Sequence, residues 1–178
     1  MSEKQQIKRC QQGDAKALKE IYERYATQML GVCYRYVNNR ETARDLLHDG
    51  FITVFTKIGD FRGEGSFEGW LRRIFVTTSL GYLRKNANFQ EDARPVDEMY
   101  DLRHDGASAL EAMSAQELVE TIGQMPDGYR TVLNLYAVEG YSHKEIAELL
   151  HISEATSRSQ YSRARTFLQK NLKKMEAV

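Results

Sequence analysis

The chain of 178 residues is long enough for one large domain or two small ones. With 28% charged residues, 2 prolines and no apolar run near the roughly 18 residues of a membrane span, the composition excludes membrane insertion and favours a helical, cytoplasmic protein. Of the 2 cysteines, Cys33 falls on an apolar stripe and is expected to be a buried free thiol. Because neither has a metal-ligand spacing, we expect no metal and no cofactor.

The formal net charge of zero hides an uneven distribution along the chain. Residues 1–88 carry 15 Lys and Arg against 10 Asp and Glu, residues 89–114 carry 2 against 7, and residues 115–178 balance 8 against 8. From Ser157 onward the sequence contains six basic residues and a single acidic one, Glu176. The pattern predicts two blocks with basic surfaces, joined by an acidic connector.

The first block begins with two amphipathic helices. Asp14 is a suitable N-cap for a helix that runs to about Tyr36, with apolar residues at 3-4 spacing. A turn at residues 37–40 leads to a second helix over about residues 41–58, where Gly50 should cost about 1 kcal/mol relative to alanine. Three polar side chains are predicted to lie close together on the outer side of this helix: Asp45, His48 and Asp49.

Residues 59–69 form a predicted loop, in which three glycines before Ser66 allow sharp bends. Ser66 can cap a third helix that runs to Lys85 and carries paired arginines near its start. A loop with aromatic residues that leads into such a helix is typical of single-strand binding, where bases stack on rings and cations neutralise phosphates. Core packing is the favoured alternative for Trp70, Leu71 and Ile74, whereas Phe61 and Phe67 fit either role.

The connector separates this block from a second helical block. Residues 89–114 lack periodicity and are rich in Asp, Glu and Ala, so we interpret them as an extended or partly disordered linker. A capping box at Ser114 predicts a short helix, and a turn at residues 125–128 precedes another helix that ends near Gly140. No segment alternates with a period of two, so no sheet is predicted.

Residues 140–165 have the pattern of a helix-turn-helix. Ser142 and Glu145 form a capping box for a short helix, and Ser153 can cap a second helix after a three-residue turn. The spacing turns Ser157, Tyr161, Ala164 and Leu168 inward, and it leaves Arg158, Ser159, Ser162, Arg163 and Arg165 outward. An outer face of arginines and hydroxyls suits a DNA major groove. The alternative is an ordinary helical hairpin with a solvated basic face.

Taken in order, these segments resemble the extracytoplasmic-function (ECF) group of bacterial RNA polymerase sigma factors, over about residues 13–172. The resemblance is carried by ARDLLHDGF (residues 43–51), FEGWLRRI (67–74), YLRK (82–85), GYSHKEIA (140–147) and RAR (163–165). It implies an all-α fold of two small helical domains, residues 1–88 and 115–178, joined by the acidic flexible linker 89–114. The second domain would be the helix-turn-helix.

The resemblance also implies a function and partners. The chain would be a transcription initiation specificity factor that binds core RNA polymerase, recognises the minus-thirty-five and minus-ten promoter elements and assists DNA melting. It would not be an enzyme and would take no small-molecule substrate. Its partners would be the clamp helices of the largest polymerase subunit, the flap and promoter DNA, with an anti-sigma factor as a further hypothesis. The acidic linker would thread a basic nucleic-acid channel, where carboxylates stand in for phosphates.

Three groups of residues take roles by the same resemblance. The core polymerase-binding residues would be Asp45, His48 and Asp49. The minus-ten residues would be Arg62, Phe67, Arg72, Arg73 and Thr77. In the reading helix, Arg158, Ser159, Gln160 and Ser162 would face base edges or nearby phosphates, and Thr156, Arg163 and Arg165 would hold phosphates.

The chain departs from the family pattern at a few positions. His48 stands where glutamine is usual, and Val76-Thr77 replaces a more usual Arg-Asn pair. Gly81 replaces an aspartate, and Ser157 stands where an apolar residue normally anchors the reading helix. The first departure bears on polymerase contact, the next two on minus-ten recognition, and the last on packing of the reading helix.

Other functions fit the sequence less well. A dimeric repressor or activator would have a similar DNA-binding domain, but it would have no use for the Gly-rich loop and the Arg72-Arg73 helix. An enzyme is disfavoured because His48, His104, His143 and His151 form no HExxH array, and no Gly-rich phosphate loop follows a strand. A helical adaptor is disfavoured by the basic reading helix.

Overall fold

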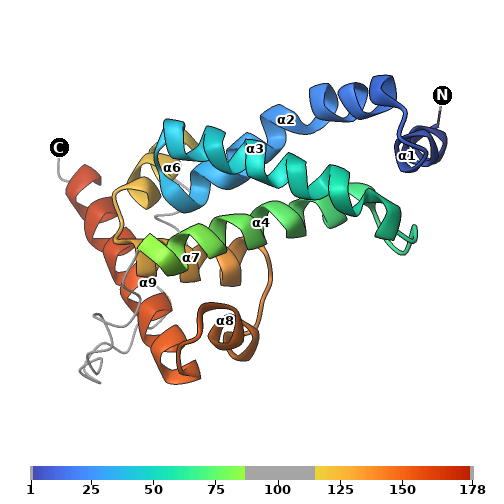
Figure 1. The fold of residues 1–178 in the computed structure, drawn as a ribbon. Coiled ribbons are helices and arrows are strands. Elements are labelled where there is room, and N and C mark those ends of the chain that lie inside the picture. Colours follow the sequence, from blue (N-terminus) through green and yellow to red (C-terminus); the bar gives the residue numbers. More distant parts are fainter. Residues whose placement is uncertain (1, 87–114, 177–178) are drawn as a thin grey trace. The chain divides into compact units, whose positions relative to one another are not determined.

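The structure is a computed structural model that describes residues 2–86 and 115–176, and every regular element in these ranges is helical (Figure 1). The first range contains α1 (Glu3–Gln11), α2 (Ala15–Val37), α3 (Arg40–Lys57), the short 3-10 helix η1 (Ile58–Asp60) and α4 (Phe67–Asn86). The second contains α6 (Ala115–Gly123), α7 (Asp127–Leu133), the π-helix η2 (Asn134–Val138), α8 (His143–Leu150) and α9 (Glu154–Glu176). The prediction of an all-α chain is confirmed.

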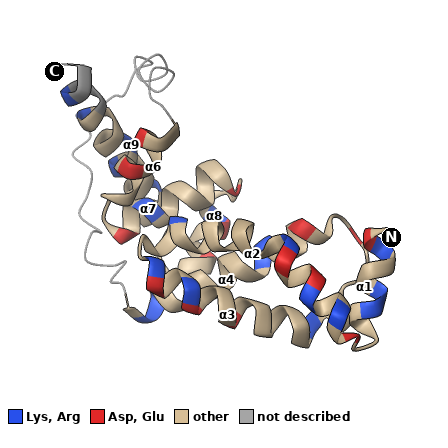
Figure 2. Ribbon diagram, turned by 90° about the horizontal axis from the view of Figure 1, so that it is seen from above, with Lys and Arg blue, Asp and Glu red and all other residues tan. Residues whose placement is uncertain are grey.

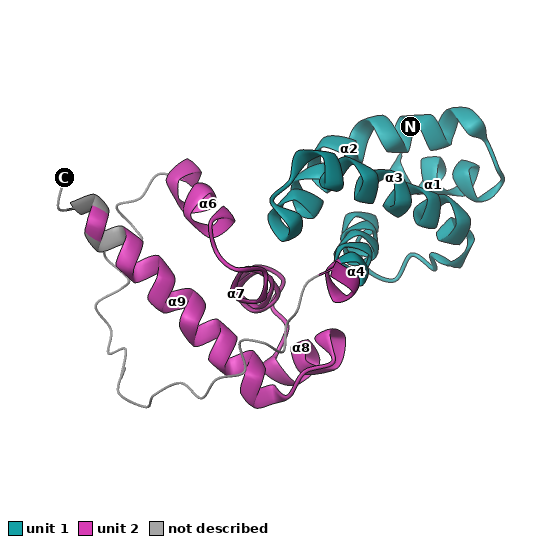
Figure 3. Cartoon of the chain, turned by 60° about the vertical axis from the view of Figure 1, so that its left-hand side comes forward, with its two compact units in different colours: residues 1–82 teal, residues 83–178 magenta. Residues whose placement is uncertain are grey.

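The chain divides into two compact units, Met1–Tyr82 and Leu83–Val178 (Figure 3). The division falls inside α4, so the last residues of this helix are counted with the second unit. The predicted acidic linker, residues 89–114, lies outside the described residues. The domain boundaries 1–88, 89–114 and 115–178 therefore stay a prediction.

Side-chain caps fix the starts of α2 and α4 in unit 1, as the sequence predicts. The Asp14 carboxylate accepts hydrogen bonds from the backbone N–H groups of Lys16 (2.9 Å) and Ala17 (3.2 Å) at the start of α2. The Ser66 hydroxyl accepts one from the Gly69 N–H (3.0 Å) at the start of α4. These bonds satisfy N–H groups that have no partner within the helix, so both helices begin where the sequence places them.

The core of unit 1 is an aromatic cluster between α2, α3 and α4. The Phe51 ring lies 4.7 Å from the Tyr22 ring and 5.1 Å from the Phe75 ring, measured between centroids. Burial of Cys33 in the same unit confirms the expected buried thiol, and it raises the pKa of that thiol to about 11. Both ring pairs bury apolar area, and the Phe51 and Phe75 rings also meet in the favourable edge-to-face arrangement, with 68° between their planes.

Gly50 in the middle of α3 has a packing reason. A Cβ atom built on Gly50 would lie 2.1 Å from Cε1 of Phe75, whose ring is fully buried. The absent side chain lets the Phe75 ring approach the α3 backbone directly. The close contact between α3 and α4 therefore offsets the low helix propensity of glycine at this position.

Helix α1 is not predicted by the sequence analysis. Its inner face buries Ile7 and Cys10. Polar contacts also tie it to α2: the Tyr25 hydroxyl donates to the Glu3 carboxylate (2.7 Å), and the Arg9 guanidinium pairs with Asp14 (2.7 Å). Few apolar positions mark this helix in the sequence, because much of its attachment is polar.

In unit 2, α7 and α8 pack against the long helix α9. Met125, Leu133, Ala164 and Leu168 form a buried cluster around which the partly buried apolar side chains of α6 and α9 gather. Arg130 is only 4% exposed, and its guanidinium donates to the carbonyl oxygen of Met125 (2.8 Å) while it pairs with Asp127. This buried cation closes the turn between α6 and α7.

Candidate functional site

Three distinct surfaces carry the residues that the sequence singles out, and positions of Lys and Arg and of Asp and Glu are distributed among the helices (Figure 2). The first is the outer face of α3. Asp45, His48 and Asp49 are all exposed there, at the i, i+3 and i+4 positions that place them together, as predicted. The same face presents Ile52, whose side chain is 65% exposed despite being apolar. The two carboxylates on this face give it a charge that complements a basic protein surface.

The second surface is a cavity of about 340 Å³ in unit 1. It lies between α3, η1 and the first half of α4, and its walls are Thr53, Lys57, Asp60, Trp70, Arg73, Ile74, Thr77 and Thr78. Two of the predicted minus-ten residues, Arg73 and Thr77, therefore line one cavity. The volume lies at the lower end of the ~300–1,000 Å³ range of small-molecule sites.

The chemistry of the cavity suits a nucleotide. Trp70 is half-buried and offers an aromatic face, and Lys57 and Arg73 supply two cations for neighbouring phosphates. The hydroxyls of Thr53 and Thr78 already donate to the backbone carbonyls of Asp49 (3.0 Å) and Ile74 (2.9 Å). Thr53, Lys57 and Asp60 are side chains that the sequence analysis did not single out, because they join the site only through the packing of α3 on α4.

The other predicted minus-ten residues lie elsewhere. Arg62 is exposed in the loop, and Arg72 is half-buried on α4, outside the cavity wall. The prediction for Phe67 is wrong, because its ring is only 1% exposed and packs against Phe61 (5.2 Å) and Trp70 (5.6 Å). Phe67 is the first residue of α4, and the turn into the helix directs its ring into the core rather than toward a base.

The third surface is the helix-turn-helix formed by α8 and α9 in unit 2. The Ser142 hydroxyl and the Glu145 carboxylate form the predicted capping box at the start of α8. His151 takes the left-handed conformation after α8 (φ 55°), and the Ser153 hydroxyl accepts from the Thr156 N–H (3.0 Å) at the start of α9. The predicted caps and the predicted tight turn are confirmed.

The side chains on α9 divide by exposure. Arg158 and Arg165 are exposed, and the half-buried residues are Thr156, Ser159, Ser162 and Arg163. The prediction that Gln160 faces DNA is wrong. Its side chain is 1% exposed, and it lies on the same helical face as the buried Ser157 and Ala164. Within the described ranges, neither atom of its amide group has a hydrogen-bond partner.

His143 explains how a polar Ser157 can anchor the reading helix. The buried Ser157 hydroxyl shares a 2.9 Å hydrogen bond with Nδ1 of His143, on the first turn of α8. The imidazole ring stacks on Tyr136 (4.5 Å between centroids, 13° between planes), and the Tyr136 ring also contacts Tyr161 (4.5 Å). His143 therefore joins η2, α8 and α9 through these contacts.

This stacked histidine predicts a pH dependence of stability. Burial, assisted by the nearby Arg158 charge, lowers the pKa of His143 below its usual value. The unfolded chain therefore takes up a proton before the folded chain does, and stability falls as the pH drops through and below about 6.5. We expect His143→Gln to be less sensitive to acid than the wild type in urea unfolding at pH 7.5 and 5.5. An equal loss of stability in both proteins would contradict this expectation.

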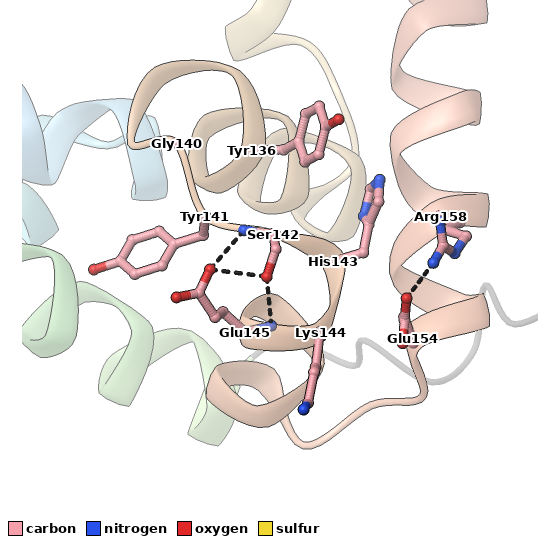
Figure 4. A pocket seen from close by; sticks show the side chains of 9 residues that line it. All are labelled: Tyr136, Gly140, Tyr141, Ser142, His143, Lys144, Glu145, Glu154 and Arg158. Carbon is pink, nitrogen blue, oxygen red and sulfur yellow. Dashed lines mark hydrogen bonds and ion pairs between the residues drawn. The ribbon is translucent and has the colours of Figure 1, made fainter.

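A groove of about 600 Å³ lies beside the helix-turn-helix (Figure 4). Its lining residues are Tyr136, Gly140, Tyr141, Ser142, His143, Lys144, Glu145, Glu154 and Arg158. Arg158 pairs with Glu154 one turn earlier on α9, and Lys144 lies on the first turn of α8. The groove therefore carries both signs of charge, and Tyr136 and Lys144 are lining residues that sequence spacing did not identify.

Two further properties of the described residues bear on function. No group of three or more His, Cys, Asp or Glu side chains in the described ranges is placed to hold a metal ion. A search of the same ranges found no helix with the length and apolar character that a membrane span requires.

Comparison with known proteins assigns both units. Residues 21–89 match the Sigma-70 region 2 family, and residues 115–168 match the Sigma-70 region 4 family. An ECF RNA polymerase sigma-E factor from Haemophilus influenzae is 33% identical over 176 residues, which cover 93% of each chain. The ECF RNA polymerase sigma factor SigW from Bacillus subtilis is 31% identical over 180 residues, 96% of each chain.

Solved structures share the fold. CnrH, in complex with the cytosolic domain of CnrY, superposes with a TM-score of 0.50 and 21% identity over 94% of this chain and 95% of that chain. The sigma factor RpoE from Bartonella quintana, in complex with the anti-sigma factor NepR, gives 0.52 and 19% identity over 89% and 98%. With both regions in the expected order and close relatives matched over nearly their whole length, this chain belongs to the ECF family of RNA polymerase sigma factors, the initiation factors that direct the polymerase to promoters.

Proposed function

We propose that the three surfaces divide the work of promoter recognition among them. The exposed face of α3, with Asp45, His48 and Asp49, docks on the clamp helices of the largest polymerase subunit. Its two carboxylates are suited to basic residues on the partner, and the exposed Ile52 adds apolar contact area. The flap of the polymerase is the partner proposed for unit 2.

The cavity in unit 1 captures a base of the minus-ten element. A base extruded from the non-template strand stacks on Trp70, while Arg73 and Lys57 neutralise its flanking phosphates and Thr77 lies within the same wall. Arg62 and Arg72 contact the adjacent strand outside the cavity. Unstacking a base costs a few kcal/mol, and occupation of a matching cavity offsets part of this cost.

The helix-turn-helix reads the minus-thirty-five element. Arg158, exposed at the start of α9, is the residue proposed for a base edge, and Ser159 and Ser162 lie on the same outer side. The remaining half-buried or exposed side chains proposed for phosphates are Thr156, Arg163 and Arg165. Such contacts fix register and depend strongly on salt.

The two DNA-binding surfaces act together only on the polymerase. Each offers few phosphate contacts, so the affinity of the free protein for duplex DNA is weak. Held by the polymerase, the second contact forms at a high effective concentration, and the spacing between the elements selects promoters. The catalysis belongs to the polymerase, and this chain makes and breaks no bond.

Regulation and location follow from the same proposal. The RpoE structure from Bartonella quintana contains an anti-sigma factor, and we extend this kind of partner to the present chain. The working compartment is the cytoplasm, where the polymerase and the promoters lie.

The observation that supports the proposal is that one chain has two unlike features: a cavity with aromatic and cationic walls, and a helix-turn-helix with an exposed arginine. Run-off transcription with core polymerase over a randomised promoter library tests it directly. Transcripts that start from promoters with two shared sequence elements at a fixed spacing support the proposal. Tight sequence-specific gel shifts without polymerase would instead favour a dimeric operator-binding regulator.

Charge reversal of Arg158 is expected to weaken selection of the minus-thirty-five element. Loss of one well-aligned contact to a base edge costs about 1–3 kcal/mol, which is about fivefold to 150-fold in promoter preference. Arg158→Glu should reduce transcription from promoters that depend on this element, and it should relax the preference in the library at one or two positions. Lys170→Glu, an exposed substitution later on α9, is the matched control for charge. Equal effects of the two variants would show that Arg158 contributes only general attraction.

A further inference from the structure

The first residues of the Gly-rich loop are held by a side chain from a different helix. Gln11, the last residue of α1, donates hydrogen bonds from Nε2 to the carbonyl oxygens of Ile58 (3.0 Å) and Phe61 (3.1 Å). These carbonyls stand at either end of η1, which is closed by a bond from the Phe61 N–H to the Ile58 carbonyl (3.2 Å). One amide group therefore pins both ends of the turn that begins the loop.

The pinned turn forms part of the cavity. Asp60, within the turn, lines the cavity together with Trp70. The ring of Phe61, directly after the turn, lies 5.4 Å from the Trp70 ring and 5.2 Å from the Phe67 ring. The position of the turn thus sets where Asp60 stands and supports one side of the aromatic wall.

Helix α1 is attached to the rest of unit 1 by its own contacts, and these hold the backbone of Gln11 in place. Ile7 and Cys10 are buried, and Glu3 and Arg9 bond to Tyr25 and Asp14 of the neighbouring segment. The side chain of Gln11, in contrast, is exposed and makes no part of the core. The Gln11 side chain contributes to the structure through its two hydrogen bonds to the loop rather than through packing.

We propose that α1 is a clamp on the start of the Gly-rich loop, and that Gln11 is a positioning residue for capture of the extruded nucleobase. The inference rests on the proposed function of the cavity. A loop that is ordered before the base arrives loses less conformational freedom at the moment of capture, so the clamp favours binding of the single strand and promoter opening. Gln11 touches no DNA in this role.

The test uses three substitutions in the full-length protein. Gln11→Glu keeps size and shape but replaces the donor with a carboxylate that faces two carbonyl oxygens. Gln11→Ala removes the group, and Gln11→Lys restores a donor on a flexible stem. Gln12→Glu, at the neighbouring exposed residue, is the control for added charge.

Two measurements report on the clamp. Trp70 is the only tryptophan of the chain, so its fluorescence and its quenching by acrylamide follow the cavity wall in the free protein. Promoter opening by the holoenzyme is followed with a fluorescent base analogue in the minus-ten element. We expect Gln11→Ala and Gln11→Glu to increase quenching and to slow opening about threefold to tenfold, the effect of losing one or two hydrogen bonds. Gln11→Lys should recover most of both, and Gln12→Glu should resemble the wild type.

The outcomes separate this inference from the proposed function. If Gln11→Glu opens promoters as fast as the wild type, or if Gln11→Lys is as slow as Gln11→Ala, the clamp is refuted. If Trp70 quenching changes without any change in opening, the loop is held by Gln11 but capture does not depend on it, and the inference also fails. Arg73→Glu tests the cavity itself: normal opening in that variant would refute the site of base capture, whatever the Gln11 variants do.

Discussion

Asp45→Lys protein is expected to lose binding to core RNA polymerase while its fold is kept. Asp45 is exposed on α3 beside Asp49, and the substitution reverses one of the two negative charges on this face. Placing a cation opposite basic residues of a partner costs about 2–5 kcal/mol or more, which is at least about thirtyfold in affinity. Co-purification with core polymerase, followed by titration with labelled protein, measures the loss.

The control for this experiment is Glu23→Lys on α2. The Glu23 side chain is 62% exposed. Its replacement by lysine makes the same change of charge on a different helix. Both variants should melt within a few degrees of the wild type, because exposed substitutions change stability by about 0.5 kcal/mol or less. Recovery of Asp45→Lys in the polymerase complex at normal yield would show that the docking face has been placed on the wrong surface.

Gly50→Ala should destabilise unit 1, although alanine is the better helix former. The new Cβ would lie 2.1 Å from Phe75 Cε1, far inside the roughly 3.5–4.0 Å of a normal carbon contact, so the fully buried ring or its neighbours must shift. Overpacking of this kind costs about 1–3 kcal/mol beyond the gain in helix propensity. For a domain of this size, each kcal/mol lowers the melting temperature by about 4–8 °C.

Gly31→Ala is the matched control, since Gly31 also lies within a helix but meets nothing within 4 Å of the added Cβ. It should stabilise the protein by about 0.5–1 kcal/mol. Trp70 fluorescence in a urea titration follows unit 1 in both variants. If both alanine variants stabilise the protein, the close approach of Phe75 to α3 does not restrict position 50.

Local chemistry explains most of what the sequence predicted correctly. Asp14, Ser66, Ser142 and Ser153 cap helices through bonds to residues two or three positions later, so the signal and its effect lie in the same short segment. The exposed face of α3 follows from helical spacing alone. For this reason the starts of α2 and α4 and the helix-turn-helix could be predicted without a structure.

The errors come from places where packing decides. Gln160 is polar, yet it follows Ser157 by three residues and therefore lies on the buried face of α9. The sequence analysis assigned Tyr161 to that face instead of Gln160. Phe67 is exposed or buried according to how the loop enters α4, and sequence spacing contains no information on that angle. Helix α1 was missed although Ser2 and Gln5 form a capping box at its start, because Ile7 and Cys10 are its only apolar residues and polar bonds to α2 and to the loop add to their packing.

The pairing of Arg158 with Glu154 has a consequence for specificity. A guanidinium that already holds a carboxylate must release it before it can bind DNA, so the gain from meeting an arbitrary phosphate is reduced. A better-aligned acceptor, such as a guanine edge, compensates for loss of the bond to the Glu154 carboxylate. Because exposed pairs of this kind contribute only about 0.3–0.5 kcal/mol, we expect the competition to lower the affinity of Arg158 for an arbitrary phosphate by about twofold.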